Sequence, residues 1–405
     1  MKYVSDKLAA VGASASVEAS QKAREMKAAG LNVASLSSGE PDFPTPAHIA
    51  EAGIAAIRDG MTTYTDVRGI PDLRKAIQRK FKRENNIEYD LDNIIAGPGA
   101  KSLIGTALSA SVNPGDEIII PAPAWVSYVD IAKLVGGAPV VIQAKAEFGL
   151  KLDAATLEAA ITQRSRWLIL NSPSNPTGSV YTRDELRALG DVLLRHPDIL
   201  IMTDEIYEHL LFDGVKFVSF VEANPDLKER TLTLNGASKA YAMTGWRIGY
   251  AGGPAPLIKA MTKVAGQMVG PMCSISQAAT VAALDGPNDY LSERAAAYQQ
   301  RRDRVMELLL EVPGLNVQKP SGAFYLFVEC GALLGSKTAA GKVLASDVDV
   351  TNWLLEEAMV VCVPGAAYGL SPYFRISIAT SLAVLEDACA RITKAVASLT
   401  KEAAA

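Results

Sequence analysis

The sequence predicts an α/β fold in which a mainly parallel sheet is covered by helices and joined to a smaller, discontinuous α+β domain. In the middle of the chain, short apolar runs alternate with helical patterns. Runs that are apolar on both faces suit strands buried within a parallel sheet. The length of 405 residues also exceeds what one compact core usually holds. We therefore expect two domains.

The N-terminal part of the chain is expected to begin with a helix over residues 17–29. Ser16 is placed to cap this helix and Gly30 to end it. Three prolines in GEPDFPTP (39–46) exclude regular structure there, so this segment is predicted to be a loop. Two more helices are predicted over 47–59 and 71–84, joined by a turn-rich stretch that contains Tyr64.

The alternating middle of the chain carries the predicted sheet. Its expected strands are 117–121, 139–143, 167–171, 199–204, 231–236 and 248–253. Its expected helices are 101–112, 125–136, 183–195, 255–266 and 274–285. This alternation predicts a mainly parallel sheet that is covered by helices.

After a turn at residues 285–289 the pattern changes. The expected elements are a long charged helix (291–311), a strand (322–329), a helix (349–358), strands at 359–364 and 374–379, and a final helix (382–400). The N-terminal segment is expected to pack with these elements. The predicted division is therefore 1–48 and 291–405 for the small domain and 49–290 for the large one.

Composition excludes several classes of function. The formal net charge is −4, which does not favour nucleic acid as a partner. No apolar run is long enough to span a bilayer, and the first residues lack the apolar core of a secretory signal, so the cytoplasm is the expected location. Four scattered cysteines and three histidines show no metal-ligand spacing. We therefore expect no metal, and an organic cofactor becomes the more attractive alternative.

Polar side chains follow directly after the predicted strands. In open α/β sheets, ligands bind beyond the carboxyl ends of the strands. The residues at these positions are Trp125, Asn171, Asn175, Asp204, Tyr207, Ser238, Lys239 and Arg247. An acid, a lysine, an arginine, amides, a phenol and an indole are thus expected to meet at one edge of the sheet.

This set of side chains suits pyridoxal 5′-phosphate. Lys239 can hold an aldehyde as an imine, and Asp204 can keep a pyridine nitrogen protonated. Tyr207 and Asn175 fit the ring hydroxyl, and Trp125 can stack on the ring face. Arg247 and Ser238 can bind a phosphate. The backbone N–H groups of the GPGAKS turn, at Gly99, Ala100 and Lys101, would add to that phosphate site.

Six segments carry a family resemblance. They are GEPDFPTP, GIPDLR, NSPSNPTG, TDEIYEHL, SKAYAMTGWRIGYAGGP and FRIS, in this order and spacing. Together they resemble class I aminotransferases of pyridoxal-phosphate fold type I, in the aspartate aminotransferase branch that contains rhizobial and Thermus enzymes. The resemblance covers essentially the whole chain and implies a seven-stranded, mainly parallel sheet in the large domain.

The resemblance implies roles for individual residues. Lys239, Asp204 and Tyr207 would be catalytic, with Lys239 moving a proton between the substrate and the cofactor. Arg375, in FRIS, would bind the substrate α-carboxylate, and Gly39 would offer a backbone contact. Substrate contacts are also expected from Trp125, Asn175, Lys101 and Ser16, the last two toward a distal carboxylate. Tyr64 would reach the cofactor phosphate of a neighbouring subunit, which implies a homodimer with shared active sites.

The reaction implied is a ping-pong exchange of an amino group between an L-amino acid and a 2-oxo acid, with aspartate and glutamate as the first choice. The chain departs from the family at Ala100, Ala124, Val129 and the apolar segment 266–277. These changes leave aromatic and prephenate transamination open, as well as β-elimination or cyclisation. A cofactor-sensing regulator is disfavoured, because no helix-turn-helix pattern or basic stripe precedes GEPDFPTP.

Overall fold

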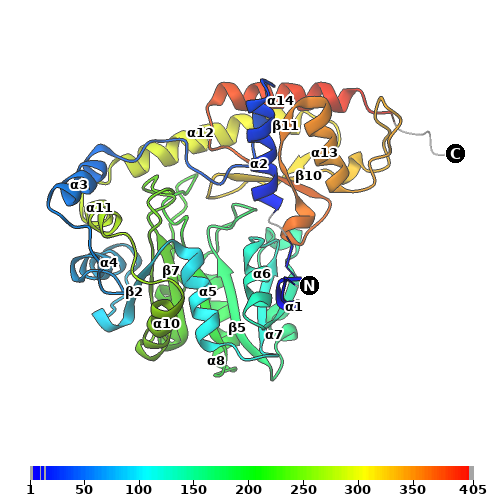
Figure 1. The fold of residues 1–405 in the computed structure, drawn as a ribbon. Helices are drawn as coiled ribbons and strands as arrows, with labels where there is room; N and C mark the ends of the chain where they lie inside the picture. Colours follow the sequence, from blue (N-terminus) through cyan, green and yellow to red (C-terminus); the bar gives the residue numbers. More distant parts are fainter. Residues whose placement is uncertain (1–2, 10, 13–14, 401–405) are drawn as a thin grey trace.

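The structure, a computed structural model, describes residues 3–9, 11–12 and 15–400 of the chain. Its centre is a seven-stranded sheet in the order β2-β8-β7-β6-β5-β3-β4 (Figure 1). The strands are β2 (Ile94–Gly97), β3 (Glu117–Ala122), β4 (Ala138–Gln143), β5 (Ser165–Asn171), β6 (Leu200–Asp204), β7 (Thr231–Gly236) and β8 (Gly249–Gly252). The predicted α/β class is confirmed, as is the seven-stranded sheet.

Strands β3 to β7 run parallel, while β8 runs antiparallel to both β7 and β2. Parallel neighbours need a long crossover, usually a helix, between them. The connection from β7 to β8, residues 237–248, contains turns and no helix. The chain therefore reverses directly, and the parallel order is broken at this one strand.

Helices cover both faces of the sheet. They are α3 (Ala47–Arg58), α4 (Pro71–Asn85), α5 (Ala100–Ser111), α6 (Ser127–Leu134), α7 (Ala154–Ala160), α8 (Arg183–Leu194), α9 (Phe220–Ala223), α10 (Ala255–Met268) and α11 (Ser274–Asp285). Ile118 and Ile120 pack with residues of α5, α6 and α10, whereas Ile119 packs with residues of α7 and α8. Successive strand residues point to opposite faces, so the apolar runs are explained by burial on both sides.

The second part of the molecule lies across the carboxyl edge of this sheet (Figure 1). Its elements are α2 (Ala15–Ala28), β1 (Ala34–Ser35), α12 (Tyr290–Leu310), β9 (Asn316–Val317), β10 (Tyr325–Glu329), α13 (Asp347–Ala358), β11 (Val360–Val361), β12 (Val363–Pro364), β13 (Tyr373–Ser377) and α14 (Leu382–Ala397). Strand β1 pairs with β11, and α2 contacts β12, so the N-terminal segment packs with C-terminal elements. The short helix α1 (Asp6–Ala9) instead contacts α6. The domain boundaries at residues 48 and 290 stay a prediction.

Several predicted boundaries need correction. Helix α2 begins at Ala15, so Ser16 lies within its first turn and is not its cap. Gly30 does end the helix, with a φ of 82° that a glycine adopts without strain. Helix α6 begins at Ser127 and leaves Trp125 in the preceding loop. Strand β2 and helix α7 were missed, because both are short.

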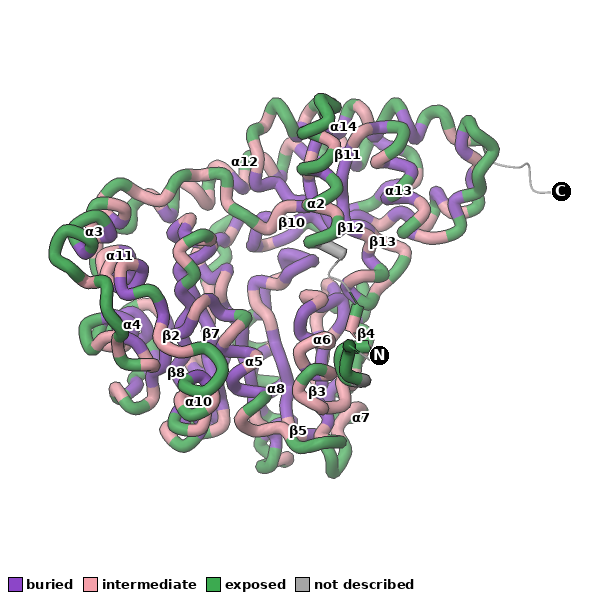
Figure 2. Tube along the Cα trace, viewed as in Figure 1, coloured by how far each residue is buried: buried purple, intermediate pink, exposed green. Residues whose placement is uncertain are grey.

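The sheet is the most deeply buried layer of the molecule, and exposed residues gather on the outer helices (Figure 2). All four residues of β2, all four of β8 and all six of β7 are buried. Within the described residues, no helix combines the length and the apolar character needed to cross a membrane. A rigid sheet edge of this kind can hold side chains in fixed positions.

Candidate active site

A cavity of about 680 Å³ lies where the carboxyl edge of the sheet meets α2 and the C-terminal part. Twelve of the predicted site residues line it, and these are Gly39, Gly99, Ala100, Lys101, Trp125, Asn175, Asp204, Tyr207, Ser238, Lys239, Arg247 and Arg375. Tyr64 does not line the cavity and is 95% exposed. The side chain of Ser16 lies outside the part of the chain that the structure describes.

Lys239 projects into this cavity from the loop that follows β7. Its amine donates to the Gly39 carbonyl at 2.5 Å. Burial, followed by the neighbouring Arg375 cation, lowers the pKa of Lys239 to about 8. A lysine with such a pKa is neutral far more often near neutral pH than an ordinary one, so it is suited to act as a nucleophile and as a base.

Asp204 ends β6 and is only 5% exposed. Its carboxylate accepts from the Tyr128 hydroxyl at 2.7 Å and from the Ile206 backbone N–H at 3.3 Å. Burial raises the pKa of Asp204, and the bond from Tyr128 opposes this. No side-chain cation forms an ion pair with it among the described residues, so a cationic ligand would meet an unmatched negative charge.

Gly99 precedes the first turn of α5 and forms a cradle with Arg247. Its φ of 89° favours glycine, and a Cβ at this position would lie 2.4 Å from Arg247 Nη2. The first turn of α5 offers free backbone N–H groups, and Arg247 adds a cation that has no acidic partner among the described side chains. This combination is a suitable site for a phosphate.

Arg375, on β13, is 2% exposed and lies at the other side of the cavity. It donates to Asn175 Oδ1 at 3.1 Å and to the Ser37 carbonyl at 2.6 Å. Its Nε is buried and has no hydrogen-bond partner within the described part of the chain. A carboxylate in the cavity would supply the acceptor that this donor lacks.

Three residues near these groups were not assigned a role from the sequence. Tyr128 binds Asp204, and Asn171 donates to the Asp204 carbonyl at 2.8 Å. The Tyr325 hydroxyl lies 2.9 Å from that of Tyr207. Asn171 is the first residue of NSPSNPTG and was already expected at this edge of the sheet, whereas Tyr128 and Tyr325 lie far in the sequence from the residues that they contact.

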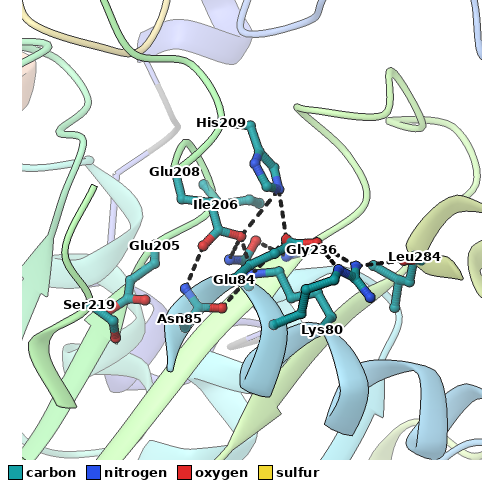
Figure 3. Close-up of polar contacts among 12 residues, drawn as sticks. Lys80, Glu84, Asn85, Glu205, Ile206, Glu208, His209, Ser219, Gly236 and Leu284 are labelled. Carbon is teal, nitrogen blue, oxygen red and sulfur yellow. Dashed lines mark hydrogen bonds and ion pairs between the residues drawn. The ribbon is translucent and has the colours of Figure 1, made fainter. Parts of the chain in front are cut away.

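A buried polar cluster contacts the loop that follows β6 and carries Glu208 (Figure 3). Glu208 accepts from the Lys80 ammonium of α4 and from Asn85 Nδ2 at 2.6 Å. It also accepts from Asn235 Nδ2 of β7 at 2.6 Å. One carboxylate therefore joins the Asp204–Tyr207 loop to the strand that leads to Lys239.

Glu84, Glu208 and His209 in this cluster come close enough together to hold a metal ion. The Lys80 ammonium, however, already donates to Glu208 and lies 3.7 Å from Glu84 Oε2. Although burial opposes it, the charge of Lys80 lowers the pKa of Glu208. A lysine thus occupies the place of a cation, and the cluster is a buried ion pair that supports the loop.

The apolar segment 266–277 does not line the cavity of its own chain. It holds the loop that carries Tyr64. Ser274 donates to the Met61 carbonyl at 2.5 Å, and Gln277 donates to Thr65 at 2.9 Å. Tyr64, Met268 and Val269 are all exposed, with Met268 at 73%. Within the described part of the chain, this segment therefore supports the Tyr64 loop and does not line the cavity.

Three comparisons with known proteins agree with this geometry. The family model described as aminotransferase class I and II matches residues 32–392. The chain is 50% identical to a probable aspartate/prephenate aminotransferase of Rickettsia bellii over 98% of this chain and 100% of that protein. It is 49% identical, with a TM-score of 0.96, to the crystal structure of the Rhizobium meliloti aspartate aminotransferase, covering 99% and 100% of the two chains. A Thermus thermophilus aspartate aminotransferase solved with maleate is 38% identical, with a TM-score of 0.91 and coverage of 98% and 100%.

Proposed function

This chain belongs to the class I and II aminotransferases, and we propose that it uses pyridoxal 5′-phosphate to move an amino group between aspartate or glutamate and a 2-oxo acid. The single observation that supports this most is the cavity of about 680 Å³ that has a buried amine, a buried acid and a phosphate cradle on its walls. The cytoplasmic location expected from the sequence stays a prediction.

The residues present fit the cofactor at three points. The Gly99 turn and Arg247 form a cradle for a phosphate, because glycine suits the φ of 89° there and a Cβ at this position would clash with the Arg247 guanidinium. Asp204 is a buried carboxylate without a cationic partner among the described side chains, which matches a protonated pyridine nitrogen. Lys239 offers an amine whose pKa is lowered to about 8. Trp125 and Tyr207 also line this cavity.

The bound cofactor supplies an electrophilic aldehyde and an electron-withdrawing pyridine ring. Asp204 would keep the ring nitrogen protonated, because a buried carboxylate stabilises a neighbouring cation. The neutral Lys239 amine would take the proton from the substrate Cα and return it. Arg375 would fix the substrate through its α-carboxylate, so that this Cα–H bond faces Lys239.

Lys101 supports a substrate with a second carboxylate. Its ammonium lies 4.7 Å from the centre of the Trp125 ring and forms no ion pair with a described residue. Burial, followed by the Arg247 cation, lowers the pKa of Lys101. A cation at the cavity wall without an ion-pair partner among the described residues favours an anionic substrate group. The Thermus neighbour, solved with the dicarboxylate maleate, is in line with this choice.

A screen of half-reactions tests the substrate class. Purified enzyme loaded with pyridoxal phosphate is mixed with each amino acid in turn, and the loss of the cofactor's visible absorbance is followed. Aspartate and glutamate should react fastest. Aromatic amino acids reacting faster, or prephenate proving the best acceptor, would replace the proposed substrates. Release of ammonia without a 2-oxo acid would indicate elimination.

Lys101→Gln should lower kcat/KM for aspartate roughly 10- to 100-fold, because one charge-assisted hydrogen bond is lost. The same variant should leave kcat/KM for alanine nearly unchanged, since alanine has no distal carboxylate. Exposed Lys263→Gln serves as the control. An equal loss for aspartate and alanine would remove Lys101 from substrate recognition and assign it to the cofactor site alone.

The exposed Tyr64 side chain supports a homodimer with shared active sites. Tyr64, Ile57, Met268 and Val269 are large apolar residues exposed on one chain. Exposed apolar residues that gather on a surface commonly mark a contact between proteins. In such a dimer, Tyr64 would serve the phosphate cradle of the partner subunit.

Mixed dimers test this arrangement. Tyr64→Ala and Lys239→Ala subunits are each expected to be impaired, but a dimer of one of each contains one site with both wild-type side chains. After the two variants are unfolded and refolded together, up to about a quarter of wild-type activity should appear, because half of the dimers are mixed and each has one intact site. No gain over Tyr64→Ala alone would mean that Tyr64 does not act across the interface.

A further inference from the structure

Tyr325 stands between two groups of the candidate site, Tyr207 and Arg375. It begins β10 and is 1% exposed. Its hydroxyl lies 2.9 Å from the Tyr207 hydroxyl. Its ring lies under the Arg375 guanidinium, with 4.4 Å between the guanidinium carbon and the ring centre. A single side chain thus touches both the proposed cofactor contact and the proposed carboxylate contact.

The position of Tyr325 is fixed by its surroundings. In the register of β10 against β13, Tyr325 is paired with Ser377. The Phe324 ring packs against it with ring centres 4.7 Å apart. A Cβ at Gly39 would lie 2.9 Å from the Tyr325 hydroxyl, so glycine at that position leaves the hydroxyl its space. The ring therefore cannot turn away without moving several neighbours.

The hydroxyls of Tyr207 and Tyr325 share one hydrogen bond, in which either can be the donor. Which of them donates decides whether Tyr207 can use its own proton for the cofactor. If Tyr207 donates to the ring oxygen of the cofactor, its own oxygen must accept the proton of Tyr325. The Arg375 cation over the Tyr325 ring favours this direction, because a nearby positive charge makes a phenol a better donor. A donor that is itself hydrogen-bonded in this way is a stronger donor to the next group.

We propose that Tyr325 is a positioning residue with two separable actions: its hydroxyl strengthens Tyr207 as a donor to the cofactor, and its ring holds Arg375 in place for the substrate carboxylate. This inference rests on the proposed function, since it assumes that pyridoxal phosphate occupies the cavity. The role falls on the strand predicted at 322–329, which carries no other proposed site residue. Tyr325 itself is not assigned a chemical step.

Two substitutions separate the two actions. Tyr325→Phe removes the hydroxyl and keeps the ring, whereas Tyr325→Leu removes both. Tyr89→Phe is the matched control, because Tyr89 is also buried and its hydroxyl also meets a single hydroxyl, that of Thr233 at 3.2 Å. Thermal unfolding of each variant verifies that it is folded.

The first readout is the pH midpoint at which the absorbance of the bound cofactor changes. In the deprotonated form of the bound cofactor, the ring oxygen would carry its full negative charge. A weaker hydrogen-bond donor at Tyr207 would therefore destabilise the deprotonated form relative to the protonated form. Tyr325→Phe should therefore raise the midpoint by about 0.5–1 unit, the effect of one hydrogen bond. Tyr207→Phe should raise it more, and Tyr325→Phe should add nothing in the Tyr207→Phe background, because the effect passes through Tyr207.

The second readout is the dissociation constant of maleate, an unreactive dicarboxylate. Tyr325→Phe should change this constant less than about twofold, whereas Tyr325→Leu should raise it roughly 3- to 30-fold through loss of the cation–π contact. The proposed action of the hydroxyl is overturned if the pH midpoint of Tyr325→Phe equals that of wild type and of Tyr89→Phe, or lies below it. Equal maleate constants for the Phe and Leu variants overturn the action of the ring. If the wild-type protein takes up no pyridoxal phosphate, the proposed function itself fails. This outcome is observed on the wild-type protein alone, so it is distinct from any result obtained with the Tyr325 variants.

Discussion

Replacing Lys239 with alanine is expected to lower kcat by at least about 10⁴-fold, because one change removes both the nucleophilic amine and the base that moves the Cα proton. The lowered pKa of the Lys239 amine suits it to both roles. With a pKa of about 8, about a quarter of it is neutral at pH 7.5, against about one part in a thousand for an ordinary lysine. No other lysine of the cavity wall is joined to Gly39 in this way.

Steady-state turnover of aspartate with 2-oxoglutarate measures this loss, and exposed Lys263→Ala is the control. The same lysine can be followed in the wild-type protein. The rate at which cofactor-free enzyme captures pyridoxal phosphate should rise with pH, reach half of its maximum near pH 8 and level off above about pH 9, because only the neutral amine reacts. Substantial activity in Lys239→Ala would overturn the assignment. A capture rate that still rises steeply to pH 10 would mean that Lys239 titrates as an ordinary lysine.

The part of the site that follows the strands could be predicted from the sequence. Asp204 ends β6, and Lys239 follows β7, so their positions depend only on the order of elements along the chain. Parallel strands end at the same edge, which brings such residues together whatever the details of packing. The family resemblance is confirmed by the match over residues 32–392.

The contacts between distant segments could not be predicted in the same way. Tyr325 reaches Tyr207 and Arg375 only because of the register of β10 against β13, which a single sequence does not reveal. Tyr128 reaches Asp204 across 76 residues of sequence, from the start of α6 to the end of β6, and a single sequence does not reveal this contact.

The reversal at β8 has a similar origin. The apolar run that became β8 looks like any other strand, and strand direction is set by the connection that precedes it. GASKAYAMTGWRI could be read as turns or as a short helix, and the structure has turns. This connection carries Ser238, Lys239 and Arg247, so the segment that departs from regular alternation also carries three of the proposed cofactor contacts, among them the amine.

Replacing Arg375 with alanine is expected to lower kcat/KM for aspartate roughly 30- to 1,000-fold, chiefly through a higher KM, because a buried cation that faces the α-carboxylate is lost. The expectation rests on the Arg375 Nε–H group, which is a hydrogen-bond donor without an acceptor among the described residues. Asn175 and the Ser37 carbonyl already take two of its N–H groups, while its buried Nε has no described partner. At saturating aspartate, kcat should fall less, since Lys239 and Asp204 are untouched.

Part of this loss would come from the groups that Arg375 leaves behind, since the alanine variant strands the Asn175 amide oxygen and the Ser37 carbonyl without their donor. Arg375→Lys keeps a cation and loses the planar fork, so it should fall between wild type and alanine if a bidentate carboxylate contact is what matters. Binding of β-alanine, which lacks the α-carboxylate of aspartate, gives the decisive comparison. Its affinity should change little in Arg375→Ala, whereas Arg391→Ala, far from the cavity on α14, should affect neither ligand. An equal loss for aspartate and β-alanine would show that Arg375 supports the fold of the cavity and does not bind the α-carboxylate.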